Sequence, residues 1–319
     1  MLDIKQVYSI NFPTPIRFGA GVIKELGFYL KGNNLSSPLL VTDSNVAELK
    51  FFKEIQKNLE QHGLSTEVYK EMHKNPIKSD VLHGGDMYHK TKRDCIIGIG
   101  GGVALDVARA IVLRVNHKRD LFDYDDLIGG DKYVTEDVPH FITVPTTSGT
   151  GSEVGRSAII SEDDTKKKRI LFSPKLLARI VFADPLLTME LPSFITAATG
   201  MDALTHNMEA YLAKGFHPMC DGIALEGISL INDSLVTSTF TRTNEFEIEM
   251  YNGIEDSSSI SWVNNCEFLL TKINPRTNQE KRPIRIKILR TYGDQYDFEY
   301  SQVNNPQKIS RGSVKRVSN

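Results

Sequence analysis

The chain has 319 residues, 40% of them hydrophobic and 24% charged, enough to bury the cores of about two domains. Its 38 lysines and arginines nearly balance its 40 aspartates and glutamates, which excludes the net charge typical of nucleic-acid or membrane-surface binding. The N-terminus lacks the basic start and apolar core of a signal peptide, and no stretch is apolar for long enough to span a bilayer. We therefore expect a cytoplasmic protein with neither nucleic-acid nor membrane partners.

Short apolar runs alternate with helix-length amphipathic stretches in the first half of the chain. This alternation predicts an α/β domain, a Rossmann-like parallel sheet with helices on both faces and a ligand site beyond the C-terminal ends of the strands. Strands are expected at 39–41, 95–99 and 141–144, and helices at 46–61, 79–90 and 104–115.

The pattern changes twice further along the chain. Helices are expected at 194–212, capped by Ser193, and from 218 to about 236, which makes a partial all-helical domain. The tail then alternates like β-strands around turns at Asn274-Pro275 and Tyr292-Gly293, and the polar, basic end from Asn304 is expected to be frayed. The predicted domains are therefore 1–190, 191–236 and an atypical, β-rich tail at 237–319.

A glycine turn follows the predicted strand 95–99. Gly100, Gly101 and Gly102 lead directly into a helix, whose first amides and dipole suit a bound pyrophosphate. Asp106 lies in the first turns of this helix and joins the cofactor-binding candidates. Because Val103 stands where the fingerprint G-x-G-x-x-G needs its third glycine, a tight turn that binds nothing stays open as the alternative.

Asp43 ends the earlier segment LLVTD and is placed to accept hydrogen bonds from an adenosine ribose. Its charge would favour NAD over the 2′-phosphorylated form by repulsion. A helix cap is the alternative reading.

A loop rich in hydroxyl groups follows the strand 141–144. Thr146, Thr147 and Ser148 supply hydroxyls on a backbone loosened by glycines, which suits contacts to phosphate, ribose or nicotinamide. Its place just past a strand end favours binding over the alternative of a solvated loop.

Asp202 and His206 stand four residues apart in the helix 194–212, so both side chains lie on one face within reach of a single ion. An imidazole beside a carboxylate can bind Fe²⁺ or, alternatively, Zn²⁺. Glu209 lies further along the same face. An ordinary ion pair between Asp202 and His206 is the alternative reading.

Taken together, these segments resemble the iron-containing (group III) alcohol dehydrogenases, over about residues 8 to 236. The most specific motifs are IGIGGGVALDVARAI, ITVPTTSGTGSEV and ADPLLTMELPSFITAATGMDALTHNMEAYL. The resemblance implies an N-terminal dinucleotide-binding domain, an all-helical domain, and a metal that polarises the oxygen of an alcohol or aldehyde during hydride transfer to NAD.

Residue by residue, the resemblance places the ribose contact at Asp43, the pyrophosphate at Gly101 and Gly102, and the nicotinamide side at the hydroxyl loop. It also implies a basic cofactor contact at Lys168 and the first two metal ligands at Asp202 and His206. No catalytic side chain is assigned.

Two departures from the family pattern affect function. Val103 replaces a serine of the turn, which removes a hydroxyl donor from the phosphate site. Arg109 replaces a lysine of the helix that follows. The family takes two further histidine ligands from its helical domain, but this chain has no histidine after His217, which lies in a turn where the family has no ligand. The helical domain is therefore expected to be truncated or replaced after about residue 236.

The sequence thus predicts an oxidoreductase that transfers hydride between a primary alcohol, or its aldehyde, and NAD(H), impaired by the loss of two metal ligands. The alternative is a non-catalytic dinucleotide-binding remnant or interaction module. Because later helices would normally cover apolar residues such as Leu204, Leu225 and Ile228, we also expect a homo-oligomer, which light scattering would detect.

Overall fold

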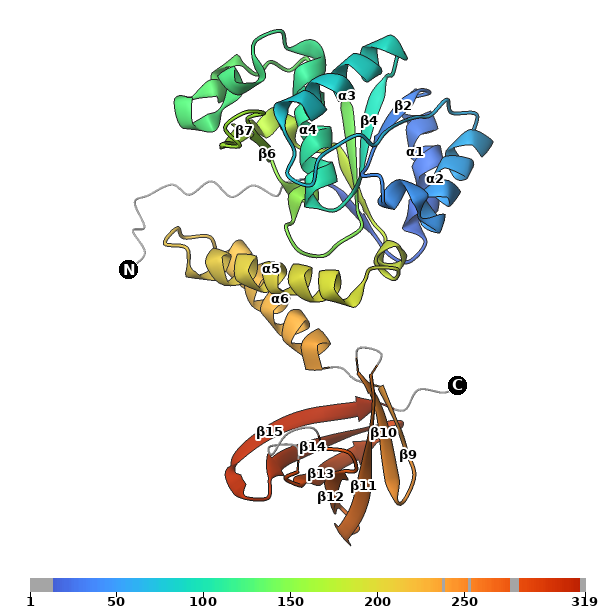
Figure 1. The fold of residues 1–319 in the computed structure, drawn as a ribbon, viewed down its shortest axis with the longest axis vertical. Helices are drawn as coiled ribbons and strands as arrows, with labels where there is room; N and C mark the ends of the chain where they lie inside the picture. Colours follow the sequence, from blue (N-terminus) through green and yellow to red (C-terminus); the bar gives the residue numbers. More distant parts are fainter. Residues whose placement is uncertain (1–13, 237–238, 252–253, 276–280, 316–319) are drawn as a thin grey trace. The chain divides into compact units, whose positions relative to one another are not determined.

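A computed structural model describes residues 14–236, 239–251, 254–275 and 281–315. The chain divides into two compact units, Met1–Ile231 and Asn232–Asn319, which are treated separately below. The first unit contains a parallel sheet, its covering helices and two further helices, and the second is an antiparallel sheet (Figure 1). This order confirms the α/β fold class with a helical segment and a β-rich tail.

The first unit is built on a six-stranded sheet in the order β1-β8-β5-β4-β2-β3, with parallel pairing throughout. Its strands are β1 (Ile16–Phe18), β2 (Pro38–Val41), β3 (Glu67–Tyr69), β4 (Cys95–Gly100), β5 (His140–Pro145) and β8 (Ile180–Ala183). A separate antiparallel hairpin pairs β6 (Ser157–Ser161) with β7 (Lys168–Phe172). The three strands expected from the sequence are β2, β4 and β5.

Helices cover both faces of this sheet (Figure 1). They are α1 (Leu26–Gly32) and α2 (Lys50–Gln61) on one face, and α3 (Lys78–Lys90) and α4 (Gly102–Asn116) on the other. Short 3₁₀ turns fill the connections: η1 (Val22–Glu25), η2 (Val46–Glu48), η3 (Leu121–Tyr124), η4 (Asp126–Ile128), η5 (Gly130–Tyr133), η6 (Ser152–Val154), η7 (Pro174–Leu176) and η8 (Pro185–Thr188).

Strand periodicity divides the apolar side chains between two cores. In β4, Ile96 packs with α3 and α4, whereas Ile97 and Ile99 pack with α1 and α2. In β2, Leu39 and Leu40 divide in the same way. Successive side chains of a strand point to opposite faces, so a strand buried on both sides reads as a continuous apolar run.

Two helix starts differ from the expectation. The helix expected at 46–61 is broken at Leu49, whose extended backbone (φ −70°, ψ 149°) separates η2 from α2. Ser193 does not cap the next long helix, because Pro192 occupies the cap position and its carbonyl accepts from the amides of Ile195 and Thr196. Ser193 is therefore the first residue inside that helix.

Two long helices complete the first unit, α5 (Ser193–Leu212) and α6 (Pro218–Val236), as the sequence predicts. The structure describes every residue of α5, and none of them is buried. Phe194 and Leu212 are exposed, and in α6 so are Ile223 and Leu225. Of the residues expected to be uncovered, Leu225 is exposed, whereas Leu204 and Ile228 are half-buried.

The second unit is a curved seven-stranded sheet in which each strand pairs antiparallel with its neighbours in sequence (Figure 1). Its strands are β9 (Thr239–Arg242), β10 (Phe246–Tyr251), β11 (Ile254–Asn264), β12 (Glu267–Lys272), β13 (Ile284–Tyr292), β14 (Gln295–Gln302) and β15 (Asn305–Lys315). Ile260, Phe268 and Ile286 form its small core. The expectation of a frayed end from Asn304 was wrong for residues 305–315, because their backbone pairs with β14 as an edge strand; residues 316–319 lie outside the described residues.

Among the described residues, no helix is long and apolar enough to cross a membrane.

A buried histidine at the end of α4 makes stability depend on pH. His117 Nε2 accepts from the Thr135 amide at 2.8 Å, which leaves Nδ1 to carry the proton and donate to the Leu113 carbonyl at 2.8 Å. The contact to the Thr135 amide requires an unprotonated Nε2 and therefore the neutral ring, and burial lowers the pKa of His117. In the unfolded chain this histidine has the ordinary pKa of about 6.5, so the unfolded chain binds the proton first as pH falls.

We expect the free energy of unfolding to fall as pH drops below that value, by at most about 1.4 kcal/mol per pH unit from this group. His117→Gln should make the pH dependence shallower. Urea denaturation of both proteins at neutral and mildly acidic pH measures the difference, and equal slopes would contradict the assignment.

Candidate functional site

The candidate site lies where the strand order of the parallel sheet reverses. From β2 the chain moves outward to β3 at the sheet edge, then crosses back to β4 on the other side of β2. Open α/β sheets bind ligands in the crevice beyond the carboxyl ends of strands at such a point. Asp43 follows β2, Gly100 ends β4, and Thr146 follows β5.

The glycine turn brings the backbone of β4 into α4 with no side chain in the way. Gly100 has φ +147°, and a Cβ built on it would lie 2.8 Å from Ala104 Cβ, so only glycine fits there. Gly101 occupies the N-cap position of α4 and places no side chain over the first amides of the helix. Free amides and the helix dipole at this end suit an anion, so the residues present fit a pyrophosphate.

Asp43 has one carboxylate oxygen engaged and the other turned to the glycine turn. Oδ1 accepts from the amides of Asn45 and Val46 at 2.9 and 3.0 Å, which is the capping role left open by the sequence. Oδ2 lies 3.9 Å from the position of a Cβ on Gly100. One carboxylate oxygen therefore caps the local turn, while the other faces the candidate cofactor site.

The hydroxyl loop packs directly on the glycine turn. The amide of Thr146 donates to the Gly100 carbonyl at 3.1 Å. A Cβ on Gly101 would lie 3.4 Å from Thr147 Oγ1, and one on Gly102 would lie 2.9 Å from Thr150 Oγ1. Ser148, by contrast, is exposed. The loop therefore covers the start of α4 with threonine hydroxyls.

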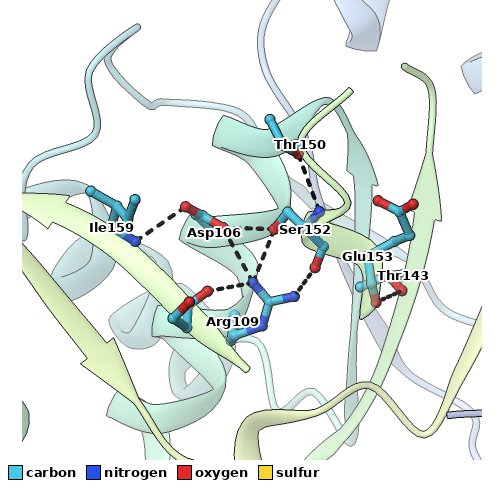
Figure 2. A network of polar contacts seen from close by, with 8 residues as sticks. Asp106, Arg109, Thr143, Thr150, Ser152, Glu153 and Ile159 are labelled. Atoms are coloured by element: carbon cyan, nitrogen blue, oxygen red, sulfur yellow. Dashed lines mark hydrogen bonds and ion pairs between the residues drawn. The ribbon is translucent and has the colours of Figure 1, made fainter. Parts of the chain in front are cut away.

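Asp106 and Lys168 lie in different surroundings. Asp106 accepts through Oδ1 from Ser152 Oγ at 2.7 Å and from Arg109 Nη1 at 3.2 Å, and through Oδ2 from the Ile159 amide at 3.1 Å (Figure 2). Burial raises the pKa of Asp106, opposed by the hydrogen bond from Ser152 and the charge of Arg109. Lys168 is exposed at the start of β7. Cofactor contacts by these two residues stay predictions.

Asp202 and His206 share a face of α5, as their spacing predicts. His206 Nε2 lies 3.6 Å from Asp202 Oδ1, and Nδ1 lies 3.8 Å from Glu209 Oε2. A Cβ on Gly149 would lie 3.3 Å from Asp202 Oδ2, so the hydroxyl loop touches this face of the helix. Contacts thus run from the glycine turn through the loop to Asp202.

The residues around Asp202 do not complete a metal shell. Within the described part of the chain, no group of three or more histidine, cysteine, aspartate or glutamate side chains is placed to hold an ion. His217 Nδ1 instead accepts from the Cys220 amide at 3.1 Å, in the first turn of α6. A protein zinc site holds three or four protein ligands, so the Asp202 and His206 pair does not fit a tightly bound metal.

Sequence reasoning missed the part played by Arg109, which is fully buried and binds the hydroxyl loop. The only signal in the sequence is a charged residue inside the apolar helix VALDVARAIVLRV. Arginine is almost never fully buried unless it is paired, so such a position predicts a buried ion pair but not its partners.

The fold and the turn together define a doubly wound α/β protein with a glycine turn and the N-terminus of α4 at its switch point. Residues 13–185 match the family described as iron-containing alcohol dehydrogenase, and residues 196–253 match the C-terminal part of the same family. The chain belongs to the iron-containing alcohol dehydrogenase family, as the sequence motifs predict.

Relatives of known activity match the same region. The chain is 35% identical over 235 residues to alcohol dehydrogenase 4 of Saccharomyces cerevisiae, covering 74% of this chain and 60% of that protein. It is 37% identical over 219 residues to 4-hydroxybutyrate dehydrogenase of Cupriavidus necator, covering 69% and 56%.

Solved structures agree in fold. A 1,3-propanediol oxidoreductase superposes with a TM-score of 0.67 at 31% identity, covering 71% of this chain and 58% of that one. The sulfoacetaldehyde reductase of Bifidobacterium kashiwanohense, solved in complex with NAD⁺, gives 0.66 at 27% identity, covering 71% and 59%. The chain therefore spans less than two thirds of these relatives' lengths, and the antiparallel sheet stands after α6 in this protein.

Proposed function

We propose that this chain binds NAD(H) at the glycine turn and retains the alcohol dehydrogenase chemistry of its family only in impaired form. The observation that supports NAD(H) binding is the turn itself, where Gly101 places no side chain over the first amides of α4, beside the threonine hydroxyls of the loop. A relative of the same fold was solved with NAD⁺, which supports the same cofactor here.

The proposal that the activity is impaired rests on the metal ligands available around α5. Asp202 and His206 supply two donors, and no third His, Cys, Asp or Glu side chain among the described residues is placed to join them as a ligand. The inherited reaction is hydride transfer between a primary alcohol, or its aldehyde, and NAD(H), with iron or zinc as the metal of the complete family site. The protein's own groups position the cofactor, whereas the substrate oxygen meets an incomplete site.

The second candidate is a non-catalytic dinucleotide-binding module. The same two-donor set favours it, and so does the antiparallel sheet that follows α6. The exposed apolar side chains of α5 and α6 are consistent with a homo-oligomer in either case. Cytoplasmic location remains a prediction from the sequence.

Titration of the full chain with NADH and NADPH, followed by nicotinamide fluorescence, tests the proposal. We expect saturable NADH binding, at least about tenfold tighter than NADPH, because Asp43 Oδ2 would repel the 2′-phosphate. Asp43→Asn should reduce this preference while NADH still binds. No saturable binding of NADH would overturn the proposal, and equal affinity for both cofactors would overturn the role of Asp43.

A further inference from the structure

A buried charged pair fastens the hydroxyl loop to α4. Arg109 is fully buried, and its Nη1 donates to Ser152 Oγ at 3.0 Å and to the Ser157 carbonyl at 2.9 Å, while Nη2 donates to the Ser152 carbonyl (Figure 2). Asp106, one helical turn earlier, accepts from the same guanidinium and from Ser152 Oγ. Two side chains of one helix thereby hold Ser152 at two of its atoms, Oγ and the carbonyl oxygen, through three hydrogen bonds.

Hydrogen bonds continue from this pair to the glycine turn. The Ser152 amide donates to Thr150 Oγ1 at 3.1 Å, and Thr150 lies against Gly102. On the sheet side, Thr143 Oγ1 donates to the Glu153 carbonyl at 3.0 Å (Figure 2). The path therefore runs from the middle of α4 through the loop and back to the start of the same helix.

The loop needs such a support because its own sequence does not fix it. Gly149, Gly151 and Gly155 give the backbone wide conformational freedom, and ordering each residue costs entropy. Ser152 lies within this glycine-rich stretch and Ser157 follows it, and Arg109 binds both. A fixed loop avoids most of the ordering cost when a cofactor binds.

The guanidinium of Arg109 makes several contacts at once. Its planar group reaches a carboxylate, a hydroxyl and two carbonyls. The Arg109 guanidinium also lies 5.7 Å from the ring centroid of Phe141 in β5. Removing the guanidinium would leave Asp106 with an uncompensated buried charge.

We propose that Asp106 and Arg109 form a positioning brace that holds the hydroxyl loop over the glycine turn and so sets the affinity for the pyrophosphate and nicotinamide end of the cofactor. This inference rests on the proposed binding of NAD(H). Neither residue is a catalytic residue, because both act through Ser152 and Thr150.

The test compares Arg109→Gln with Arg114→Gln in the full chain. Arg114 lies on the same helix and donates from Nη1 to the His117 carbonyl, outside the brace. We expect Arg109→Gln to weaken NADH binding by about tenfold, the loss typical of hydrogen bonds to a charged group. Binding of AMP, which lacks the pyrophosphate and the nicotinamide, should change less than about twofold, and Arg114→Gln should change neither.

Hydrogen–deuterium exchange of the chain without cofactor measures the order of the hydroxyl loop independently of binding. Arg109→Gln should raise amide exchange in residues 146–157 and leave exchange in α1 and α2 unchanged. Ser152→Ala removes the hydroxyl shared by Asp106 and Arg109, keeps the buried pair, and should show the same pattern if Arg109→Gln fails to fold.

The outcomes separate the two proposals. If the unmodified chain does not bind NADH, the proposed function is overturned, and exchange in the loop alone then decides whether the brace exists. If it binds NADH and Arg109→Gln binds equally well, the brace is overturned while the proposed function stands. An equal loss of NADH and AMP affinity in Arg109→Gln would show a general structural role and would also overturn the inference.

Discussion

Replacing Gly101 with aspartate is expected to weaken NADH binding by at least about 100-fold while leaving the fold at least as stable. Gly101 has an extended backbone (φ −78°, ψ −175°) that any residue can adopt, and a Cβ there meets Thr147 at 3.4 Å, close to ordinary contact. Aspartate is a preferred N-cap residue, so it should stabilise α4. The same carboxylate would occupy the anion site and repel a pyrophosphate.

Gly101→Asn is the matched control, because asparagine caps a helix equally well without the charge. Thermal unfolding and NADH titration of both variants separate stability from binding. We expect both to melt no lower than the unmodified chain, and the aspartate variant to bind NADH far more weakly than the asparagine variant. Unchanged NADH affinity in Gly101→Asp would show that the cofactor does not use this turn.

The second large effect concerns turnover. We expect the chain, supplied with Fe²⁺ or Zn²⁺, to oxidise short primary alcohols at least about 10³-fold more slowly than a complete family member. A correctly held ion contributes several kcal/mol to stabilising charge on the substrate oxygen, and two donors on one helix face cannot fix its geometry. Steady-state formation of NADH, measured beside yeast alcohol dehydrogenase 4, gives the ratio.

Asp202→Asn and His206→Gln provide the controls for turnover. Neither should change NADH affinity, and neither should lower a residual rate that does not depend on metal. A rate comparable with the yeast enzyme, abolished by His206→Gln, would show that the ligand shell is complete and that the chain is a working dehydrogenase.

The parallel sheet and the glycine turn could be predicted because their signals are local. A strand buried on both faces has to be apolar at every position, as in β4, and the turn after it has to be glycine to enter α4 at so sharp an angle. The spacing of Asp202 and His206 also placed them correctly on one helix face, since helical geometry fixes it.

Features that depend on contacts distant in sequence could not be predicted. Nothing near Arg109 in the sequence indicates that it will bind Ser152 and Ser157, more than forty residues away. The composition of the segment after Asn304 suggests a frayed end, yet pairing with β14 makes it a strand. Both outcomes are decided by tertiary partners, which outweigh local preference.

Calorimetric titration of the full chain, first with NADH and then with Zn²⁺, tests most directly whether a cofactor site is present without a complete metal site. We predict saturable, one-to-one binding of NADH and no saturable heat from Zn²⁺ at micromolar concentration. Stoichiometric, micromolar binding of Zn²⁺ that His206→Gln abolishes would contradict it.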